Sequence, residues 1–391
     1  MKTTCGVHVL HDGLVDMLYA LLPLLRDAFG LTYAEVGLIR SAHKTATSAF
    51  QIPVGIWSES TGARLPLVLG TALAGTSFVL LGSSTGFWAT LAFVFLAGCG
   101  GAFQHPIASS LISKTFDGDG QKTALGVYNA FGDVGKFLFL GATILLTATI
   151  GVSWQVPAVG FGIISLIVAT VIYFALTAAG EARAPQIEKK MSKQNNAGWG
   201  IRNKKGFMLL GVIAALDNIT RNGFLTFVSF LMIDKGISTE WAAIAVLATV
   251  FGGMIGKAVV GKLADLIGVS KTIALTEFAT ALFILLILFA PIILAFSMLP
   301  ILGVFLNGTS SIIYGTVPEV TATEKRSRAF GFIYTLGSVC GILGPLVYGF
   351  LADFFSLQTT MIIIAGMVLF TIPLCSPLSL SLNQSKPIKL K

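Results

Sequence analysis

Apolar runs of about 20 residues recur along the whole chain and alternate with short polar connections. As a helix rising 1.5 Å per residue, each run can cross a hydrocarbon core of about 30 Å. Repeated runs predict an all-α membrane protein, because backbone polar groups in lipid must be satisfied within each helix. We expect twelve spans, over residues 6–27, 34–57, 66–84, 87–114, 123–150, 154–178, 207–232, 240–263, 272–292, 297–320, 329–354 and 358–378.

Composition supports this interpretation. The 391 residues are 54% hydrophobic and 11% charged, with a mean hydropathy of +0.84, whereas soluble domains are about one-quarter charged. The first apolar run contains His8, His11, Asp12 and Asp16, so it is a poor signal peptide and should be retained.

Basic residues predict the orientation, because short loops rich in Lys and Arg stay in the cytoplasm. If both termini lie inside, the opposite side holds only Arg26 and Lys235. We therefore predict a multi-pass protein of the cell membrane, in a bacterial inner membrane, with cytoplasmic termini. The net charge of +8 is explained by contact with anionic membrane lipids, without nucleic acid. The predicted cytoplasmic positions are Lys2, Arg64, Lys114, Lys122, Lys262, Lys271, Lys325, Arg326, Arg328, Lys386, Lys389, Lys391 and the basic central loop.

The second half of the chain repeats the first at a nearly constant offset. Gly6 returns as Gly211 and Asp12 as Asp217, both with a shift of 205 residues. A polar stretch separates the halves. We expect an N-terminal six-helix bundle, a cytoplasmic linker and a C-terminal six-helix bundle with a short cytoplasmic tail, over residues 1–180, 181–206 and 207–391.

A matching pair of loops follows the second and eighth expected spans. Each reads glycine, acid, glycine, base, as Gly55, Glu59, Gly62 and Arg64, and as Gly261, Asp265, Gly268 and Lys271. This pattern resembles the cytoplasmic loop signature of the major facilitator superfamily, which implies a twelve-helix fold of two six-helix halves. The resemblance implies that the first glycine permits close helix approach and that the acid helps to lock the outward-facing state. Glu59 replaces the usual aspartate, and Ser60 stands where an arginine is common.

Further segments are similar to the fosmidomycin-resistance group of bacterial efflux proteins within that superfamily. They are His11-Asp12, Leu21-Leu22-Pro23-Leu24-Leu25, Phe29-Gly30-Leu31-Thr32, Gln51-Ile-Pro53-Val-Gly55 and Phe103-Gln104-His105-Pro106.

Charged residues inside spans should face a cavity or a partner, since one at the bilayer centre costs at least about 2.5 kcal/mol. Helical spacing places His8, Asp12, Asp16 and Tyr19 on one face of the first span. The other such residues are Arg40, His43 and Lys44 in the second span, Asn129, Asp133 and Lys136 in the fifth, Asp217, Asn218 and Arg221 in the seventh, and Lys257 in the eighth.

Depth along each helix separates these residues. Arg40 falls nearer the outside, whereas His105 and Lys257 fall nearer the cytoplasm and are candidate gates together with the loop residues Gly55, Glu59, Arg64, Gly261, Asp265 and Lys271. A group about 15 to 21 Å from the entry surface lies near the midplane, where sites of this fold are expected. It consists of Asp16, Lys44, Asp133, Lys136, Asp217 and Arg221.

These charges have two interpretations. Asp133 with Lys136, Asp217 with Arg221, and Asp16 with Lys44 would neutralise one another. Pairing leaves the basic group of the second span without an acid of its own helix, so an anionic ligand would complete it. The expected substrate-binding residues are Asp16, Arg40, His43, Lys44, Asn129, Lys136, Asp217 and Arg221, and the expected proton carriers are Asp133, Asp16 and Asp12.

Other chemistry is expected to be absent. His8 and His11 are three residues apart, but the sequence identifies no third soft ligand, so we expect no metal. The four cysteines have no paired spacing and are interpreted as packing residues. We find no nucleotide-binding loop and no supported nucleophile motif, so we expect neither an enzyme nor a cofactor.

The leading hypothesis is therefore proton-coupled export of a small anionic or polar compound, by alternating access of a monomer. The alternative within transport is uptake or facilitated movement of an anionic nutrient or metal chelate. A membrane sensor or assembly protein is the alternative outside transport.

Overall fold

The computed structural model describes residues 1–116, 118–178, 180, 201–322 and 326–384. Within these residues the regular structure is helical, and the one β-bridge pairs Ile201 with Thr321. Residues 181–200, which form most of the expected linker, lie outside the described part of the chain.

Ten segments are long and apolar enough to cross a membrane. Two more helices, α2 (Tyr33–Thr61) and α8 (Lys204–Asp234), have 29 and 31 residues and carry more polar side chains. Together they confirm the expected all-α membrane fold with twelve spans. The ten are Lys2–Phe29, Arg64–Leu81, Phe87–Ile112, Gly126–Ile150, Gln155–Ala178, Thr239–Ile267, Val269–Phe289, Ile292–Val320, Ala329–Phe354 and Leu357–Asn383.

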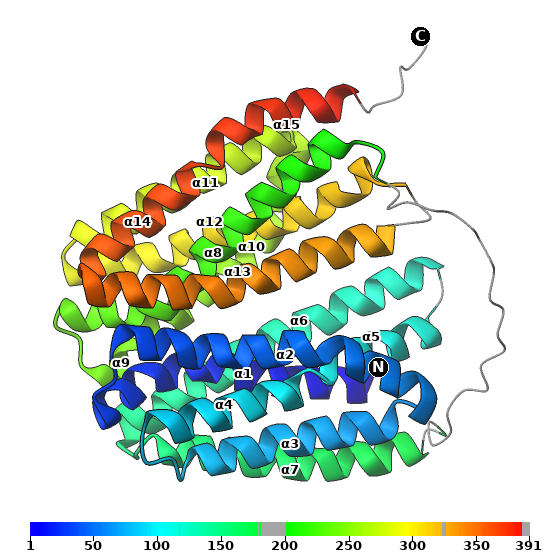
Figure 1. Cartoon of the computed structure of the whole chain (residues 1–391), viewed down its shortest axis with the longest axis vertical. Helices are drawn as coiled ribbons and strands as arrows, with labels where there is room; N and C mark the ends of the chain where they lie inside the picture. The colour runs from blue at the N-terminus through cyan, green and yellow to red at the C-terminus, as the bar shows by residue number, and fades with distance from the viewer. Residues whose placement is uncertain (117, 179, 181–200, 323–325, 385–391) are drawn as a thin grey trace. The chain divides into compact units, whose positions relative to one another are not determined.

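The chain divides into two compact units, and the first comprises Met1–Lys190 and Ser238–Ile244. In this unit α1 packs against α6, α3 against both α7 and α4, and α2 against α4; Figure 1 shows α3 beside α7. Its helices are α1 (Lys2–Phe29), α2 (Tyr33–Thr61), α3 (Arg64–Leu81), α4 (Phe87–Gly101), α5 (Gln104–Thr115), α6 (Gly118–Ile144), the π-helix η1 (Leu145–Ile150), α7 (Gln155–Ala178) and α9 (Thr239–Ala242).

Small residues bring α1 and α6 into close contact. A Cβ atom built on Gly135 of α6 would lie 2.1 Å from the backbone oxygen of Val9 on α1. A side chain there would force the helices apart, because real Cβ atoms do not approach oxygen so closely. Gly135 therefore places its neighbour Lys136 beside the polar face of α1.

The connection between α1 and α2 is short and defined by its caps. Gly30 adopts the left-handed conformation, with φ of 62°, directly after the last residue of α1. The Thr32 hydroxyl accepts from the backbone N–H of Glu35, and the Glu35 carboxylate accepts from that of Thr32. This capping box starts α2 and directs it back along α1.

The second unit comprises Met191–Ile237 and Ala245–Lys391. Here α8 packs against α13, and α11 packs against α12 and α14, an arrangement that can be followed in Figure 1. The helices are α8 (Lys204–Asp234), α10 (Ile244–Ile267), α11 (Val269–Phe289), α12 (Ile292–Val320), α13 (Arg326–Phe354), α14 (Leu357–Leu369) and α15 (Ile372–Gln384).

Three spans expected to be continuous are divided in the structure. The fourth is divided into α4 and α5, the eighth into α9 and α10, and the twelfth into α14 and α15. Pro106 and Pro373 lie in the first turns of α5 and α15, where a missing N–H is tolerated. Because proline cannot donate to the preceding turn, each helix restarts close to its proline.

Candidate functional site

Asp12 lies at the centre of a group of polar side chains in the first unit. Its Oδ2 atom lies 3.2 Å from Lys136 Nζ and 3.3 Å from His8 Nε2, and its Oδ1 atom lies 3.6 Å from His105 Nε2. Lys136 Nζ also donates to Asp133 Oδ1 at 3.1 Å. We call His8, Asp12, His105, Asp133 and Lys136 the Asp12 cluster.

Three helices contribute to this cluster. His8 and Asp12 lie one turn apart on α1, Asp133 and Lys136 one turn apart on α6, and His105 in the first turn of α5. The Asp12 side chain is 12% exposed, whereas that of His105 is 45% exposed. The cluster therefore has a buried centre and an accessible edge.

The orientation of His8 is fixed by Tyr128. His8 Nδ1 lies 2.7 Å from the Tyr128 backbone oxygen, and the two rings stack with centroids 3.9 Å apart. A carbonyl oxygen only accepts hydrogen bonds, so Nδ1 carries the proton of a neutral ring. Nε2, which faces Asp12, is then an acceptor beside a carboxylate. The contact becomes attractive when a proton is added to His8 or to Asp12.

Lys136 forms ion pairs with two carboxylates on different helices. Its side chain is 28% exposed, and its ammonium group lies close to both Asp12 and Asp133. The pair with Asp133 is the one that the sequence suggested. The pair with Asp12 crosses from α6 to α1, as does the contact between His8 and Tyr128.

His8, Asp12 and His105 also have the geometry of a metal-binding group. Their ligand atoms lie within 4.8 Å of one another. His105 supplies the third ligand that the sequence did not identify. The Lys136 ammonium group, 3.2 Å from Asp12 Oδ2, competes with a cation for the same carboxylate. The expectation of no metal stays a prediction.

The basic group of α2 is partly neutralised from α1. The Arg40 guanidinium lies 4.1 Å from the Tyr19 ring centroid and donates to the Val15 backbone oxygen at 3.2 Å. Its charge also interacts with that of buried Asp16. The expectation that this helix has no acid of its own is wrong, because α2 carries Glu35 in its first turn. The neighbouring helix α1 adds Asp16.

The remaining expected binding residues of this unit differ in exposure. His43 is buried, Lys44 is half-buried, and Asn129 is exposed on α6. His11, which the sequence placed beside the polar face, is also buried and lies 3.0 Å from the Thr71 hydroxyl.

In the second unit, Asp217 and Arg221 lie together on α8. Arg221 Nη2 is 3.7 Å from Asp217 Oδ2 and donates to Asn218 Oδ1 at 2.5 Å. The short i, i+4 spacing brings the two charges together, as the sequence suggested.

Among the expected gating residues, Arg64 links two helices of the first unit. Arg64 Nη1 donates to Thr177 Oγ1 at 2.8 Å and its guanidinium lies 4.9 Å from the Tyr173 ring centroid, which links α3 to α7. Asp265 and Lys271 are exposed, as is Lys257. The Glu59 side chain lies outside the described residues.

The two signature glycines do not make close contacts within their own units. A Cβ atom on Gly55 would meet Pro106 at 3.8 Å, an ordinary contact, and one on Gly261 would meet nothing within 4 Å. The close helix approach implied by the resemblance is therefore not found at either position within its unit. In the first unit Gly135 makes such an approach instead, against Val9 of α1.

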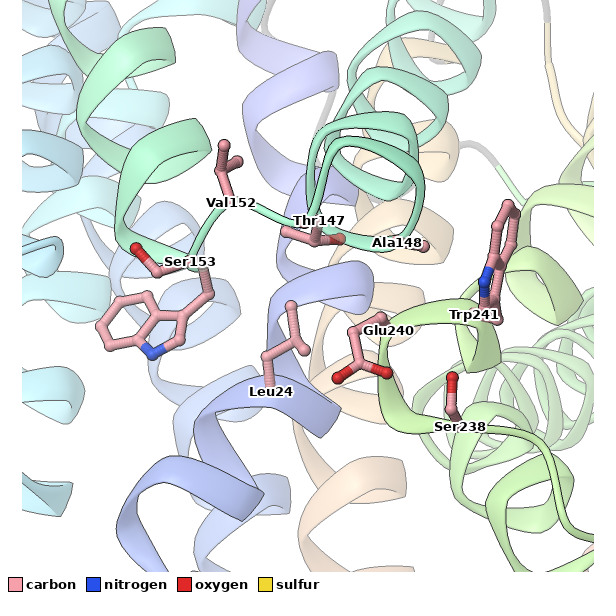
Figure 2. A pocket seen from close by; sticks show the side chains of 10 residues that line it. Leu24, Thr147, Ala148, Val152, Ser153, Ser238, Glu240 and Trp241 are labelled. Carbon is pink, nitrogen blue, oxygen red and sulfur yellow. The ribbon is translucent and has the colours of Figure 1, made fainter.

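A separate pocket of about 490 Å³ lies near the other end of α1. Figure 2 shows its lining by Leu24, Thr147, Ser153, Glu240 and Trp241, among others. Leu24 is twelve residues beyond Asp12, or about 18 Å along the helix. None of the lining residues belongs to the Asp12 cluster, and Glu240 is the one charged residue among them. The pocket and the cluster are therefore separate sites.

Three residues of these sites were missed from the sequence. Tyr128 orients His8, and Gln104 donates to the Tyr128 hydroxyl at 2.5 Å. Glu277 of α11 is 1% exposed and interacts electrostatically with Asp217 and Arg221. It is a single acid inside an otherwise apolar run, which was a detectable signal.

Comparisons with known proteins cover nearly the whole chain. A family model described as Major Facilitator Superfamily matches residues 4–252 and 210–387. The fosmidomycin resistance protein of Escherichia coli (strain K12) is 26% identical, over 90% of this chain and 86% of that protein. A hexuronate transporter of Bacillus subtilis (strain 168) is 23% identical, over 85% of this chain and 82% of that protein.

A solved structure has a similar fold. It is a bacterial homologue of the human lysosomal transporter Spinster in an inward-facing, occupied conformation. The TM-score is 0.82 at 15% identity, over 99% of this chain and 98% of the other.

Proposed function

Because the chain belongs to the major facilitator superfamily, we propose that it is a secondary active transporter that moves a small organic anion by alternating access, driven by protons. The observation that carries the proposal is the position of Lys136, a cation that forms ion pairs with two carboxylates, one of which, Asp12, also contacts two histidines. Hexuronate, named for one relative, is itself a carboxylate, which supports an anionic substrate.

Asp12 is the proposed proton carrier. It contacts two histidines and one lysine, and Asp133 forms an ion pair with the same lysine. His8 Nε2 faces Asp12 with its lone pair, so a proton shared between them turns an unfavourable contact into a hydrogen bond. Of the three expected proton carriers, Asp133, Asp16 and Asp12, we therefore assign the coupling role to Asp12, with Asp133 holding Lys136 in place.

Protonation of Asp12 changes what Lys136 can bind. A neutral carboxyl group no longer balances the ammonium charge, and Lys136 then keeps its ion pair with Asp133 and its electrostatic interaction with Asp16. An anionic group of the substrate can take the position opposite Asp12. Arg40 and Lys44 are proposed to supply further positive charge from α2.

This charge balance bears on direction. A proton on Asp12 and an anion on Lys136 favour each other, so they bind together rather than in competition. Binding together favours movement in the same direction, which is the uptake alternative. Proton-coupled export requires instead that the proton and the anion compete for the site, because the two then cross the membrane in opposite directions. Export is the alternative outcome of the test.

Reconstituted protein tests the proposal. Proteoliposomes with an acidic exterior are given a panel of small carboxylates, sulfonates and phosphonates. We expect accumulation of at least one anion, and a loss of about tenfold or more in Lys136→Gln, because a hydrogen bond to a charged group is worth about 1.5 to 3 kcal/mol. Lys262→Gln is the matched control, because the Lys262 side chain on α10 is exposed. Accumulation that ignores the pH gradient, or that is equal in Lys136→Gln, would overturn the proposal.

A further inference from the structure

The second unit contains two buried carboxyl groups near one guanidinium group. Asp217 of α8 is 2% exposed and Glu277 of α11 is 1% exposed. The charge of Glu277 interacts with those of both Asp217 and Arg221. We call these three residues the Asp217 cluster.

Arg221 does not satisfy both acids. Its Nη2 atom donates to Asn218 Oδ1 and lies 3.7 Å from Asp217 Oδ2, which is beyond hydrogen-bond distance. Asp217 Oδ2 and Glu277 Oε1 are both buried, and neither has a hydrogen-bond partner among the described residues. Each is an acceptor at which a donor is missing.

The helices around Glu277 do not supply a second cation. Apart from exposed Lys271 near the start of α11, the helices α11, α12, α14 and α15 contain no Lys, Arg or His. Among the described residues, Tyr314 of α12 interacts with Asp217 and Arg221, and Cys375 of α15 interacts with Glu277. Neither is positively charged in any protonation state.

Two ionised carboxylates and one guanidinium would leave a net negative charge in a buried site. Such an unpaired buried charge is strongly unfavourable, and the group is neutralised instead. One proton joining one carboxylate gives a carboxyl group, brings the cluster from a charge of −1 to zero, and supplies the missing O–H donor. We infer that Asp217 and Glu277 form a proton-binding site that holds one proton in this state.

A role of this proton-binding site in transport rests on the proposed function. If the protein is driven by protons, this site gives the second half its own proton carrier. Release of the proton to water restores the charge of −1, so it requires a conformation in which water reaches the pair. A change of charge by one unit then accompanies each exchange.

Infrared difference spectroscopy tests the site without substrate or gradient. Full-length protein in lipid vesicles is exchanged between mildly acidic and alkaline buffer while the C=O stretching band of protonated carboxyl groups is recorded. We expect a band that is present in acid and decreases in alkali. Glu277→Gln should remove the component assigned to this site. Glu319→Gln should retain it, because the Glu319 side chain on α12 is exposed.

A second variant keeps the test valid if Glu277→Gln fails to fold. In Asp217→Asn, Arg221 remains to neutralise Glu277, so the same component should be lost. Persistence of the band in both variants would overturn the inference, and so would a component that stays constant in alkaline buffer. Failure of anion transport in proteoliposomes would leave these spectra unchanged, so the two proposals fail separately.

Discussion

His8 directs Nε2 at Asp12, 3.3 Å from its Oδ2 atom, while Nδ1 lies 2.7 Å from the Tyr128 backbone oxygen. The backbone contact fixes which nitrogen faces the acid. Because the facing atoms of a neutral histidine and a carboxylate are both acceptors, the pair is completed by one proton. The four-residue spacing of His8 and Asp12 on α1 therefore creates a pair whose protonation we expect to control anion binding.

Replacement of His8 should change the pH dependence of transport more than its maximal rate. In His8→Leu, Asp12 loses a hydrogen-bonding partner for its proton, and we expect anion uptake to fall by about tenfold near neutral pH. More acidic buffer should restore part of it. His105→Leu is the graded comparison, since His105 is 45% exposed and 3.6 Å away, and its effect should be smaller. Equal pH profiles for His8→Leu and the unmodified protein would contradict this role.

Gly135 should be intolerant of any side chain. Gly135→Ala places a Cβ atom 2.1 Å from the Val9 oxygen, and overpacking of this kind costs about 1 to 3 kcal/mol. We expect a lower thermal unfolding temperature and weaker anion binding, because α6 carries Lys136. Gly126→Ala, on the same helix with nothing within 4 Å of its Cβ, should be neutral or slightly stabilising. Similar unfolding temperatures for the two variants would refute the packing argument.

The signature residue Asp265 should affect rate more than affinity, since it is exposed at the end of α10 rather than inside the Asp12 cluster. We expect Asp265→Asn to slow anion exchange several-fold while the binding constant of the same anion changes little. Binding measured by calorimetry and exchange measured in proteoliposomes separate the two. A large loss of affinity with normal exchange would place Asp265 in the binding site instead.

The orientation predicted from the basic connections, with both termini in the cytoplasm, can be tested at two exposed positions. In a variant without its four cysteines, Glu240→Cys should react with an impermeant thiol reagent in intact cells, whereas Lys262→Cys should react only after the membrane is opened. Both side chains are exposed, so accessibility within the fold does not distinguish them. The reverse labelling pattern would invert the orientation.

The helices were predictable from sequence because each span is a run of apolar residues long enough to cross the membrane. Their interruptions were not, although Pro106 and Pro373 marked two of them, because a proline in a first turn and a proline inside a helix look alike in sequence. The pairs Asp133 with Lys136 and Asp217 with Arg221 were predictable, since they lie on single helices.

Contacts between helices were harder to predict. Helix period places His8 and Asp12 together, but it says nothing about which face of α6 or α5 meets them. The depth of His105 along its own helix suggested a gating residue. In the structure His105, on α5, contacts Asp12 on α1. Glu277 was missed because its partners lie on α8, 56 residues or more away in sequence.

The central claim is that proton and anion bind together at Asp12 and Lys136. The most direct measurement mixes purified protein with an anion that it transports, in weakly buffered solution with a pH indicator, and follows the proton balance. The account predicts proton uptake on binding, lost in Asp12→Asn and retained in the exposed control Asp353→Asn. Proton release on binding, or uptake unchanged in Asp12→Asn, would contradict it.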